Sequence, residues 1–179
     1  PHLVQDLLTL SRLDGGRADM VFTRFPFGDA IESVVRSNSL NAKQRGHELT
    51  YAPEGELPLV MGDRSRLEQV MMNILGNAIK YTPEHSRIEL FAAPEGKFVR
   101  ICVTDDGPGI PEESRDKLFD MFYTLGKTRS DGRRGLGLGL ALCRSIVAAH
   151  GGVIDVQNAA PHGACFRFTL PRTEVTLYE

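Results

Sequence analysis

Two long stretches of the chain repeat hydrophobic residues every three or four positions, which is the period of an amphipathic helix. The first stretch covers residues 29–44 and is followed by Gly46, a typical helix stop. The second opens with Asp63, a residue that suits an N-cap, and runs to about Tyr81. Its apolar positions form one continuous face: Leu67, Val70, Met71, Ile74, Leu75, Ala78 and Ile79. We therefore predict two helices that each bury one side in a core.

Three shorter segments are also predicted to be helical. A helix over residues 139–150 follows directly from a glycine-rich turn, and residues 111–119 begin with a proline that suits the first turn of a short helix. Residues 3–13 carry leucines at helical spacing up to Gly15-Gly16, but about three turns are too short to be stable alone. We interpret residues 1–16 as the end of a helix from a helical domain that this chain lacks. The alternative is an N-terminal helix that lies on this domain's own core.

Alternation of apolar and polar residues predicts the strands. The alternating segments are residues 20–27, 48–52, 57–61, 86–93, 97–105, 153–158 and 164–170. The two segments that flank Pro94-Glu95-Gly96 are predicted to form a hairpin. Because strands and helices mix without strict alternation, we predict an α+β fold, a two-layer α/β sandwich with a mixed sheet and helices on one face. The domain is predicted to cover residues 17–171, with a tail at 172–179.

Composition narrows the possible functions. Lys and Arg number 21 against 23 Asp and Glu, a formal net charge of −2, and 41% of the 179 residues are hydrophobic. This balance excludes a polybasic nucleic-acid tail and a disordered acidic segment, so we expect no nucleic-acid partner. No apolar run approaches the ~18 residues that a membrane-spanning helix needs, so we expect no membrane contact by this fragment.

The cysteines bear on the cellular compartment. Cys102, Cys143 and Cys165 are odd in number and have no C-x-x-C spacing. This pattern argues against a disulfide framework and against a zinc cluster, and it favours a reducing, cytoplasmic setting. The chain begins at Pro1 without an initiator Met, and we interpret it as a fragment of a longer protein.

The glycine-rich turn before the last helix is a candidate phosphate site. It consists of Gly135, Leu136, Gly137, Leu138, Gly139 and Leu140. Glycines let the backbone approach a ligand closely, and a helix start offers unpaired N–H groups, a combination that suits phosphate. The spacing is neither a Walker A loop nor a Rossmann motif, and a close-packed turn is the alternative. Upstream, the basic loop over residues 123–135 includes Arg133 and Arg134, whose forked donors suit a polyphosphate.

Two further constellations carry polar groups that suit a nucleotide. Asp105 ends an apolar strand and precedes Asp106-Gly107-Pro108-Gly109, so its carboxylate can accept a hydrogen bond from an exocyclic amino group; an acidic turn is the alternative. On the predicted helix from Asp63, Asn73, Asn77 and Lys80 share a face, with Tyr81 next to them. Amide oxygen suits Mg²⁺ and lysine suits phosphate, whereas two surface asparagines would be the simpler interpretation. Phe119 and Phe122 bracket the start of the basic loop and are interpreted as anchors to the core.

Taken together, these motifs resemble the ATP-binding domain of sensor histidine kinases, a Bergerat-type (GHKL) fold shared with gyrase, mismatch-repair and heat-shock chaperone ATPases. The matching motifs are Asn73-Ile-Leu-Gly-Asn77-Ala-Ile-Lys80-Tyr81, Asp105-Asp-Gly107-Pro-Gly109-Ile110, Phe119-Asp-Met-Phe122, Gly135-Leu-Gly137-Leu-Gly139-Leu, and Gly151-Gly152 with Gly163-Ala-Cys-Phe. They occur in the family's order across residues 63–170. Residues 131–143 and the run around Cys165 are most similar to KdpD-type osmosensitive potassium sensor kinases. The opening segment resembles the end of the second dimerisation helix.

The resemblance implies a role for each matching residue. Asp105 would bond the adenine amino group, Asn77 would ligate Mg²⁺, and Asn73 and Lys80 would approach the phosphates of ATP. Tyr81 would line the nucleotide site. The remaining implied nucleotide contacts are Gly107, Gly109, Ile110, Phe122, Arg133, Arg134, Gly135, Leu136, Gly137, Leu138, Gly139 and Leu140. Two positions depart from many relatives, which carry Thr or Ser at Leu136 and Thr at Cys165.

The resemblance also implies a reaction. Hydrolytic relatives carry Glu at the position of Asn73, and an amide cannot act as a general base, so we expect transfer of the γ-phosphoryl of ATP rather than efficient hydrolysis. The implied acceptor is a histidine on the dimerisation domain of the same protein, for relay to a response regulator, in a full-length homodimer that is membrane-anchored. No histidine of this chain lies in the family's acceptor motif. The alternatives are a non-catalytic nucleotide-binding or docking module, a GHKL-type ATPase that uses Glu68 as base, and an anti-sigma serine kinase.

Overall fold

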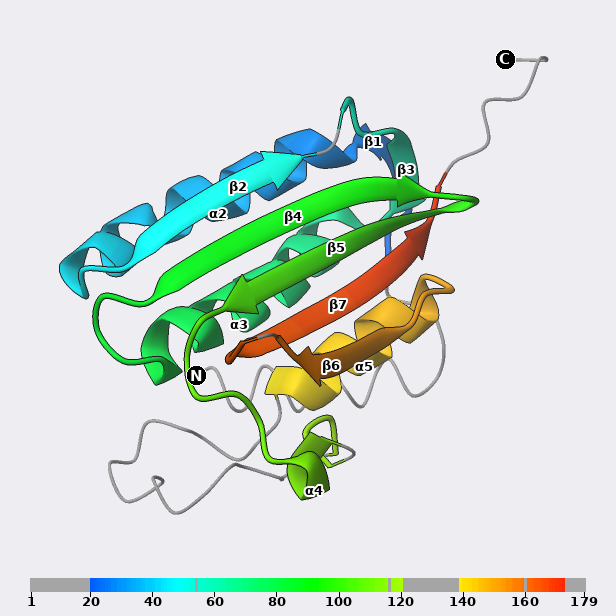
Figure 1. Cartoon of the computed structure of the whole chain (residues 1–179). Coiled ribbons are helices and arrows are strands. Elements are labelled where there is room, and N and C mark those ends of the chain that lie inside the picture. The colour runs from blue at the N-terminus through cyan, green and yellow to red at the C-terminus, as the bar shows by residue number, and fades with distance from the viewer. Residues whose placement is uncertain (1–19, 54, 116, 121–138, 160, 173–179) are drawn as a thin grey trace.

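A computed structural model describes residues 20–53, 55–115, 117–120, 139–159 and 161–172 of the chain (Figure 1). The elements are β1 (Thr23–Pro26), α2 (Phe27–Gln44), β2 (Glu48–Pro53), β3 (Leu59–Gly62), α3 (Arg64–Tyr81), β4 (Arg87–Glu95), β5 (Phe98–Asp105), α4 (Glu112–Arg115), α5 (Gly139–Ala149), β6 (Ile154–Asn158) and β7 (Ala164–Pro171).

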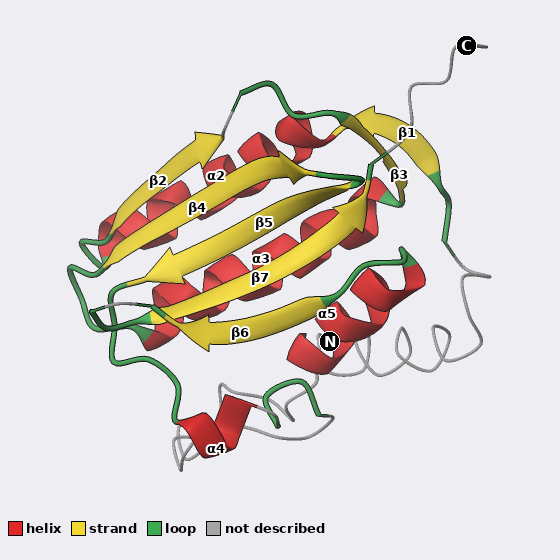
Figure 2. Ribbon diagram, turned by 45° about the vertical axis from the view of Figure 1, so that its right-hand side comes forward, coloured by secondary structure: helices red, strands yellow, loops and turns green. Residues whose placement is uncertain are grey.

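The main sheet has five strands in the order β2-β4-β5-β7-β6, and helices α2, α3 and α5 cover one of its faces (Figure 2). Strands β2 and β4 are parallel, whereas every other neighbouring pair in this sheet is antiparallel. A separate antiparallel pair joins β1 to β3. The predicted mixed sheet with helices on one face is confirmed.

Helix α3 forms as its sequence predicts. Asp63 caps it by accepting a hydrogen bond from the Arg66 backbone N–H at 3.2 Å. Its buried residues are the seven apolar positions that the periodicity selects: Leu67, Val70, Met71, Ile74, Leu75, Ala78 and Ile79. These side chains fill the space between the sheet and helices α2 and α5, so α3 is the central helix of the layer.

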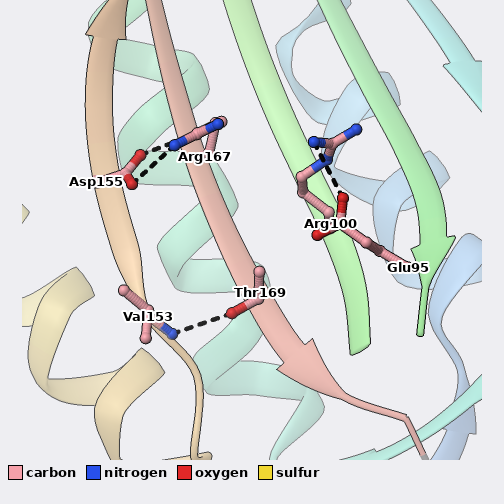
Figure 3. Close-up of polar contacts among 6 residues, drawn as sticks. All are labelled: Glu95, Arg100, Val153, Asp155, Arg167 and Thr169. Carbon is pink, nitrogen blue, oxygen red and sulfur yellow. Dashed lines mark hydrogen bonds and ion pairs between the residues drawn. The ribbon is translucent and has the colours of Figure 1, made fainter. Parts of the chain in front are cut away.

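Strand alternation divides the sheet into a core face and an open face. On β5, Val99, Ile101 and Val103 are buried in the core. The intervening side chains point to the opposite face, where the side chain of Arg100 lies 3.1 Å from Glu95 and Arg167 bonds Asp155 (Figure 3). Within the described residues, no helix covers this second face (Figure 1).

Two predicted elements differ from the structure. The strand predicted over residues 20–27 is limited to Thr23–Pro26, because α2 begins at Phe27 directly after Pro26. The helix predicted over residues 111–119 is only Glu112–Arg115. It is followed by turns in which the backbone N–H of Lys117 bonds the Ser114 carbonyl and that of Asp120 bonds the Lys117 carbonyl. The helix predicted within residues 1–16 and the whole basic loop over residues 123–135 lie outside the described residues.

Candidate functional site

The middle of α3 meets the start of α5 through Asn73. The Asn73 Nδ2 donates to the Gly139 carbonyl oxygen at 3.3 Å and to the Cys143 sulfur at 3.7 Å. These bonds use the amide nitrogen and orient the side chain, so the Asn73 oxygen is the group left to accept. Gly139 is the first residue of α5, and the N-terminus of a helix favours anions. The structure thus brings two of the predicted phosphate-side residues together.

One turn further along α3, Asn77 and Lys80 reach the surface. The Asn77 side chain is partly exposed and makes no hydrogen bond within the described part of the chain. Its amide oxygen has the hard-donor chemistry that Mg²⁺ prefers. The Lys80 ammonium lies 5.4 Å from the ring centroid of Tyr81, a cation–π distance, and Tyr81 is 38% exposed.

Asp105 is a buried carboxylate at the end of β5. Its Oδ1 accepts hydrogen bonds from the backbone N–H groups of Gly107 at 2.9 Å and Ala164 at 3.2 Å. Both bonds end on the same oxygen, and Oδ2 accepts no hydrogen bond from another described residue. Burial, the largest influence, raises the pKa of Asp105; the two N–H bonds oppose that shift and the charge of Asp106 adds to it. The side chain is therefore fixed with one acceptor oxygen available to a ligand.

The glycines after Asp105 are needed for packing within the protein. A Cβ on Gly107 would lie 3.1 Å from the Thr82 side chain, and Gly109 has φ of +86° with its Cβ position 2.9 Å from Asn158 Oδ1. Gly163 is restricted in both respects, because φ is +117° and a Cβ would lie 1.9 Å from the Asp105 carbonyl oxygen. These contacts lie within the protein, and the predicted approach of a ligand to this loop stays a prediction.

Thr82 places the Asp105 loop beside the end of α3. Its hydroxyl donates to the Ala78 carbonyl at 2.6 Å, and the same oxygen lies 3.0 Å from His47 Nε2. Nε2 must therefore carry the proton. Burial lowers the pKa of His47, and the hydrogen bond to the Ile79 carbonyl opposes that shift. A Cβ placed on Gly107 would lie 3.1 Å from the Thr82 side chain, so the strand end with Asp105 and the end of α3 lie next to each other.

Comparison with known proteins decides the family. Residues 62–174 match the family described as histidine kinase-, DNA gyrase B- and HSP90-like ATPase. The chain belongs to this ATPase family. Its fold class, the GHKL type, agrees with the family expected from the sequence motifs.

Two curated relatives of this ATPase domain are sensor kinases. The sensor protein KdpD of Clostridium acetobutylicum is 36% identical over 171 residues, which are 96% of this chain and 19% of that protein. The adaptive-response sensory kinase SasA of Thermosynechococcus vestitus is 37% identical over 171 residues, which are 95% of this chain and 44% of that protein. The similarity to KdpD is confirmed, and SasA is equally similar. The chain spans less than half the length of either relative.

Solved structures place the ATPase domain among histidine kinase catalytic domains. The catalytic domain of histidine kinase ThkA, in a nucleotide-free form, has a TM-score of 0.77 at 33% identity and covers 87% of this chain and 100% of that chain. Full-length ShkA in complex with AMPPNP has a TM-score of 0.84 at 32% identity, over 98% of this chain and 36% of that chain. ThkA has also been solved with the response regulator TrrA. In the part of the chain that the structure describes, no helix is long and apolar enough to cross a membrane.

Several groups that build the ATPase site were not predicted from the sequence. Ala164 N–H anchors Asp105, and Asn158 holds Ile110 by accepting from its N–H at 2.8 Å and donating to its carbonyl at 3.0 Å. Thr82 is the third such residue. Gly163, which was named from the sequence only as part of a family motif, directly precedes Ala164 and is the nearest sequence signal for this contact.

Seven residues of the predicted set lie outside the described residues. They are Phe122, Arg133, Arg134, Gly135, Leu136, Gly137 and Leu138. At the boundary, Gly139 and Leu140 open α5, and Leu140 packs partly buried against the core. Phe119 is buried, with its ring edge-on to Phe166 at 6.3 Å between centroids, which confirms its predicted anchoring role.

Proposed function

We propose that this domain binds ATP with Mg²⁺ and transfers the γ-phosphoryl to a histidine of a dimerisation domain, from which a response regulator receives it. Family membership and the sensor-kinase relatives support this assignment. The observation that carries it is the Asp105 carboxylate, which two backbone N–H groups hold with one oxygen open, beside the helix that bears Asn73 and Asn77.

The adenine end of the proposed site is the Asp105 loop. Oδ2 accepts a hydrogen bond from the exocyclic amino group of adenine, while the bonds on Oδ1 keep the carboxylate from rotating. The backbone at Gly107 and Gly109 lines the ring, and the half-buried Ile110 contributes apolar contact. Because the carboxylate is already ordered before nucleotide binds, little conformational entropy is lost there.

The phosphate end of the proposed site is α3 with the start of α5. Asn77 holds Mg²⁺, which when bound offsets charge on the phosphate oxygens. Asn73 and Lys80 contact phosphate directly, next to the N-terminus of α5 at Gly139. In this proposal Arg133 and Arg134, with the glycine-rich turn 135–140, complete the phosphate contacts, and Tyr81 and Phe122 flank the nucleotide.

The choice of transfer over hydrolysis rests on Asn73. A general base must accept a proton, and an amide does not, so a water molecule at this position is not activated. The other candidate base, Glu68, is bound to Arg64 at 2.8 Å in an ion pair one turn apart on α3. The nucleophile we propose is a neutral imidazole nitrogen of the acceptor histidine: an N–P bond forms, the bond from the γ-phosphorus to ADP breaks, and the imidazole proton passes to solvent.

The proposal extends to the whole protein. ThkA, a structural relative, has been solved in complex with a response regulator, which supports a response regulator as a partner. We infer in addition that the full-length kinase is a homodimer and that this domain lies in the cytoplasm. The partners are then the histidine acceptor domain and the regulator.

A transfer assay tests the function. The chain is mixed with γ-labelled Mg-ATP and a polypeptide that carries the acceptor helices, and the label should appear on that polypeptide as acid-labile, alkali-stable phosphohistidine. A matched sample in which the acceptor histidine is replaced by glutamine should stay unlabelled. Tight ATP binding without transfer would indicate a nucleotide-binding docking module, and an acid-stable label would indicate a serine kinase.

A further inference from the structure

Two cysteines lie side by side on the open face of the sheet, opposite to the face that α3 covers (Figure 2). Cys102 is on β5 and Cys165 is on the neighbouring strand β7. In the register, Cys102 is opposite Arg167 and Thr104 is opposite Cys165, so the two cysteines occupy diagonal positions on one face. Arg167 is visible on that face in Figure 3. The strand pairing therefore brings together two thiols that are 63 positions apart in the sequence.

The two sulfur atoms differ in accessibility and hydrogen bonding. Cys165 is partly exposed, whereas Cys102 is 8% exposed. The Cys102 thiol hydrogen-bonds the Cys165 sulfur, and the Thr104 hydroxyl is a second partner of Cys165. Arg167, which bonds Asp155 at 3.0 and 2.9 Å, adds positive charge nearby. Every partner of Cys165 just named stabilises a negative sulfur.

The protonation states follow from those contacts. The bond from Cys102 is the main reason that the pKa of Cys165 is lowered; Thr104 and Arg167 act in the same direction, while burial and the charge of Asp155 oppose it. The same bond, together with burial, raises the pKa of Cys102. Cys165 is thus the thiolate and Cys102 the thiol, the arrangement of an attacking and a resolving cysteine.

The third cysteine shows what an inert thiol looks like in the same fold. Cys143 on α5 is fully buried, and its sulfur lies 3.7 Å from the Val70 carbonyl and 3.7 Å from Asn73 Nδ2. In the described part of the chain no group of three or more His, Cys, Asp or Glu side chains is placed to hold a metal ion. Two thiols without a third ligand favour two-electron thiol chemistry over metal binding.

We propose that Cys165 and Cys102 form a peroxide-reactive dithiol, in which Cys165 is the nucleophile and Cys102 closes a reversible disulfide between β5 and β7. In the first step the Cys165 sulfur attacks one oxygen of hydrogen peroxide; an S–O bond forms, the O–O bond breaks, and the released hydroxide takes a proton to leave as water. In the second step the Cys102 sulfur attacks the Cys165 sulfenic acid. An S–S bond forms, the S–O bond breaks, and the thiol proton leaves with the hydroxide as a second water.

The strand geometry makes this disulfide reversible. Diagonal neighbours on antiparallel strands are about 7–8 Å apart at Cα, whereas disulfides bridge about 4.4–6.8 Å, so the two strands must draw together. Strained disulfides have higher reduction potentials and are the ones that cellular thiols reduce.

Peptide mapping tests the dithiol without any nucleotide. The whole chain is treated with hydrogen peroxide at neutral pH, remaining thiols are alkylated, and the digest is analysed by mass spectrometry. We expect a linked pair of peptides containing Cys102 and Cys165, restored to free thiols by dithiothreitol, with Cys143 still reduced. Equal oxidation of all three cysteines, or no linked pair, would overturn the proposal.

Three variants separate the roles. Cys102→Ser should leave Cys165 as a sulfenic acid that dimedone traps, and Cys165→Ser should abolish both products. Cys165→Thr serves as a second variant without a thiol, because a β-branched residue suits a strand. Cys143→Ser is the matched control and should form the disulfide as the parent does. Circular dichroism confirms folding of each. Dimedone labelling that is absent from Cys102→Ser, or unchanged in Cys165→Thr, contradicts the assigned roles.

Discussion

Replacing Asp105 by Asn tests the proposed adenine contact with almost no change of shape. The Asn oxygen can keep the bonds from Gly107 and Ala164, which places the NH2 group where Oδ2 now stands. The ligand then meets a donor in place of an acceptor. A hydrogen bond to a charged group is worth about 1.5–3 kcal/mol, so we expect ATP affinity to fall roughly ten- to hundred-fold.

The same substitution should not destabilise the fold. Burial raises the pKa of Asp105 in the folded state, so the folded protein binds its proton more tightly than the unfolded chain does. Asp105 therefore makes its full contribution to the free energy of unfolding at pH values below its pKa in the unfolded chain. That contribution is lost as the pH rises through its pKa in the folded protein. At neutral pH the buried charge works against folding. A neutral Asn removes that cost, and we expect an unchanged or higher Tm for Asp105→Asn at pH 7.

Isothermal titration calorimetry with Mg-AMPPNP measures the effect, and Asp106→Asn is the matched control. Asp106 carries the same charge one position away, but its Oδ1 accepts from the Arg87 N–H at 2.8 Å on the exposed side. We expect the control to bind within about two-fold of the parent, a change below the worth of one hydrogen bond. Equal Kd values for parent and Asp105→Asn, with both proteins folded, would refute the adenine assignment.

Three other outcomes are expected. Asn77→Ala should remove the gain in nucleotide affinity that Mg²⁺ provides, seen by titration with and without EDTA; an undiminished Mg²⁺ effect would exclude this ligand. Gly163→Ala should lower the free energy of unfolding in urea by more than about 2 kcal/mol, because φ is +117° and its Cβ position is 1.9 Å from a carbonyl oxygen. Gly96→Ala, where φ is +60° and the Cβ position meets open space, should cost about 1 kcal/mol. Similar losses for the two variants would count against the steric argument. The rate at which iodoacetamide alkylates Cys165 should rise with pH around a midpoint below the ~8.5 of an ordinary thiol, and Cys102→Ser should shift that pH midpoint upward. An ordinary midpoint in the parent would disprove the thiolate.

Local sequence patterns were sufficient for the elements whose ends carry their own signals. Helix α3 has a capping side chain at Asp63 and an uninterrupted apolar face, and its predicted and observed spans agree within one residue. The strand over residues 20–27 lacked such a signal at its end, because Pro26 suits both an edge strand and the residue before a helix. Short elements therefore had the least certain boundaries.

The candidate site was predictable only in part, for a different reason. Asp105 and Asn73 belong to motifs of adjacent residues, which a sequence displays directly. Their partners Ala164 and Gly139 are 59 and 66 positions away along the chain, and local periodicity carries no information on such pairs. The single parallel pair, β2 with β4, was likewise not predicted, because it depends on how α3 crosses the layer.

The Ala164 contact has a consequence for biosynthesis. The carboxylate that we assign to adenine is steadied by the first residue of β7, so this half of the proposed pocket is incomplete until that strand has docked beside β5. A ribosome-bound chain that has exposed everything through β6 should therefore have little affinity for ATP. ATP therefore binds a nascent kinase only after β7 has paired with β5, and truncated chains that end before β7 do not compete for ATP.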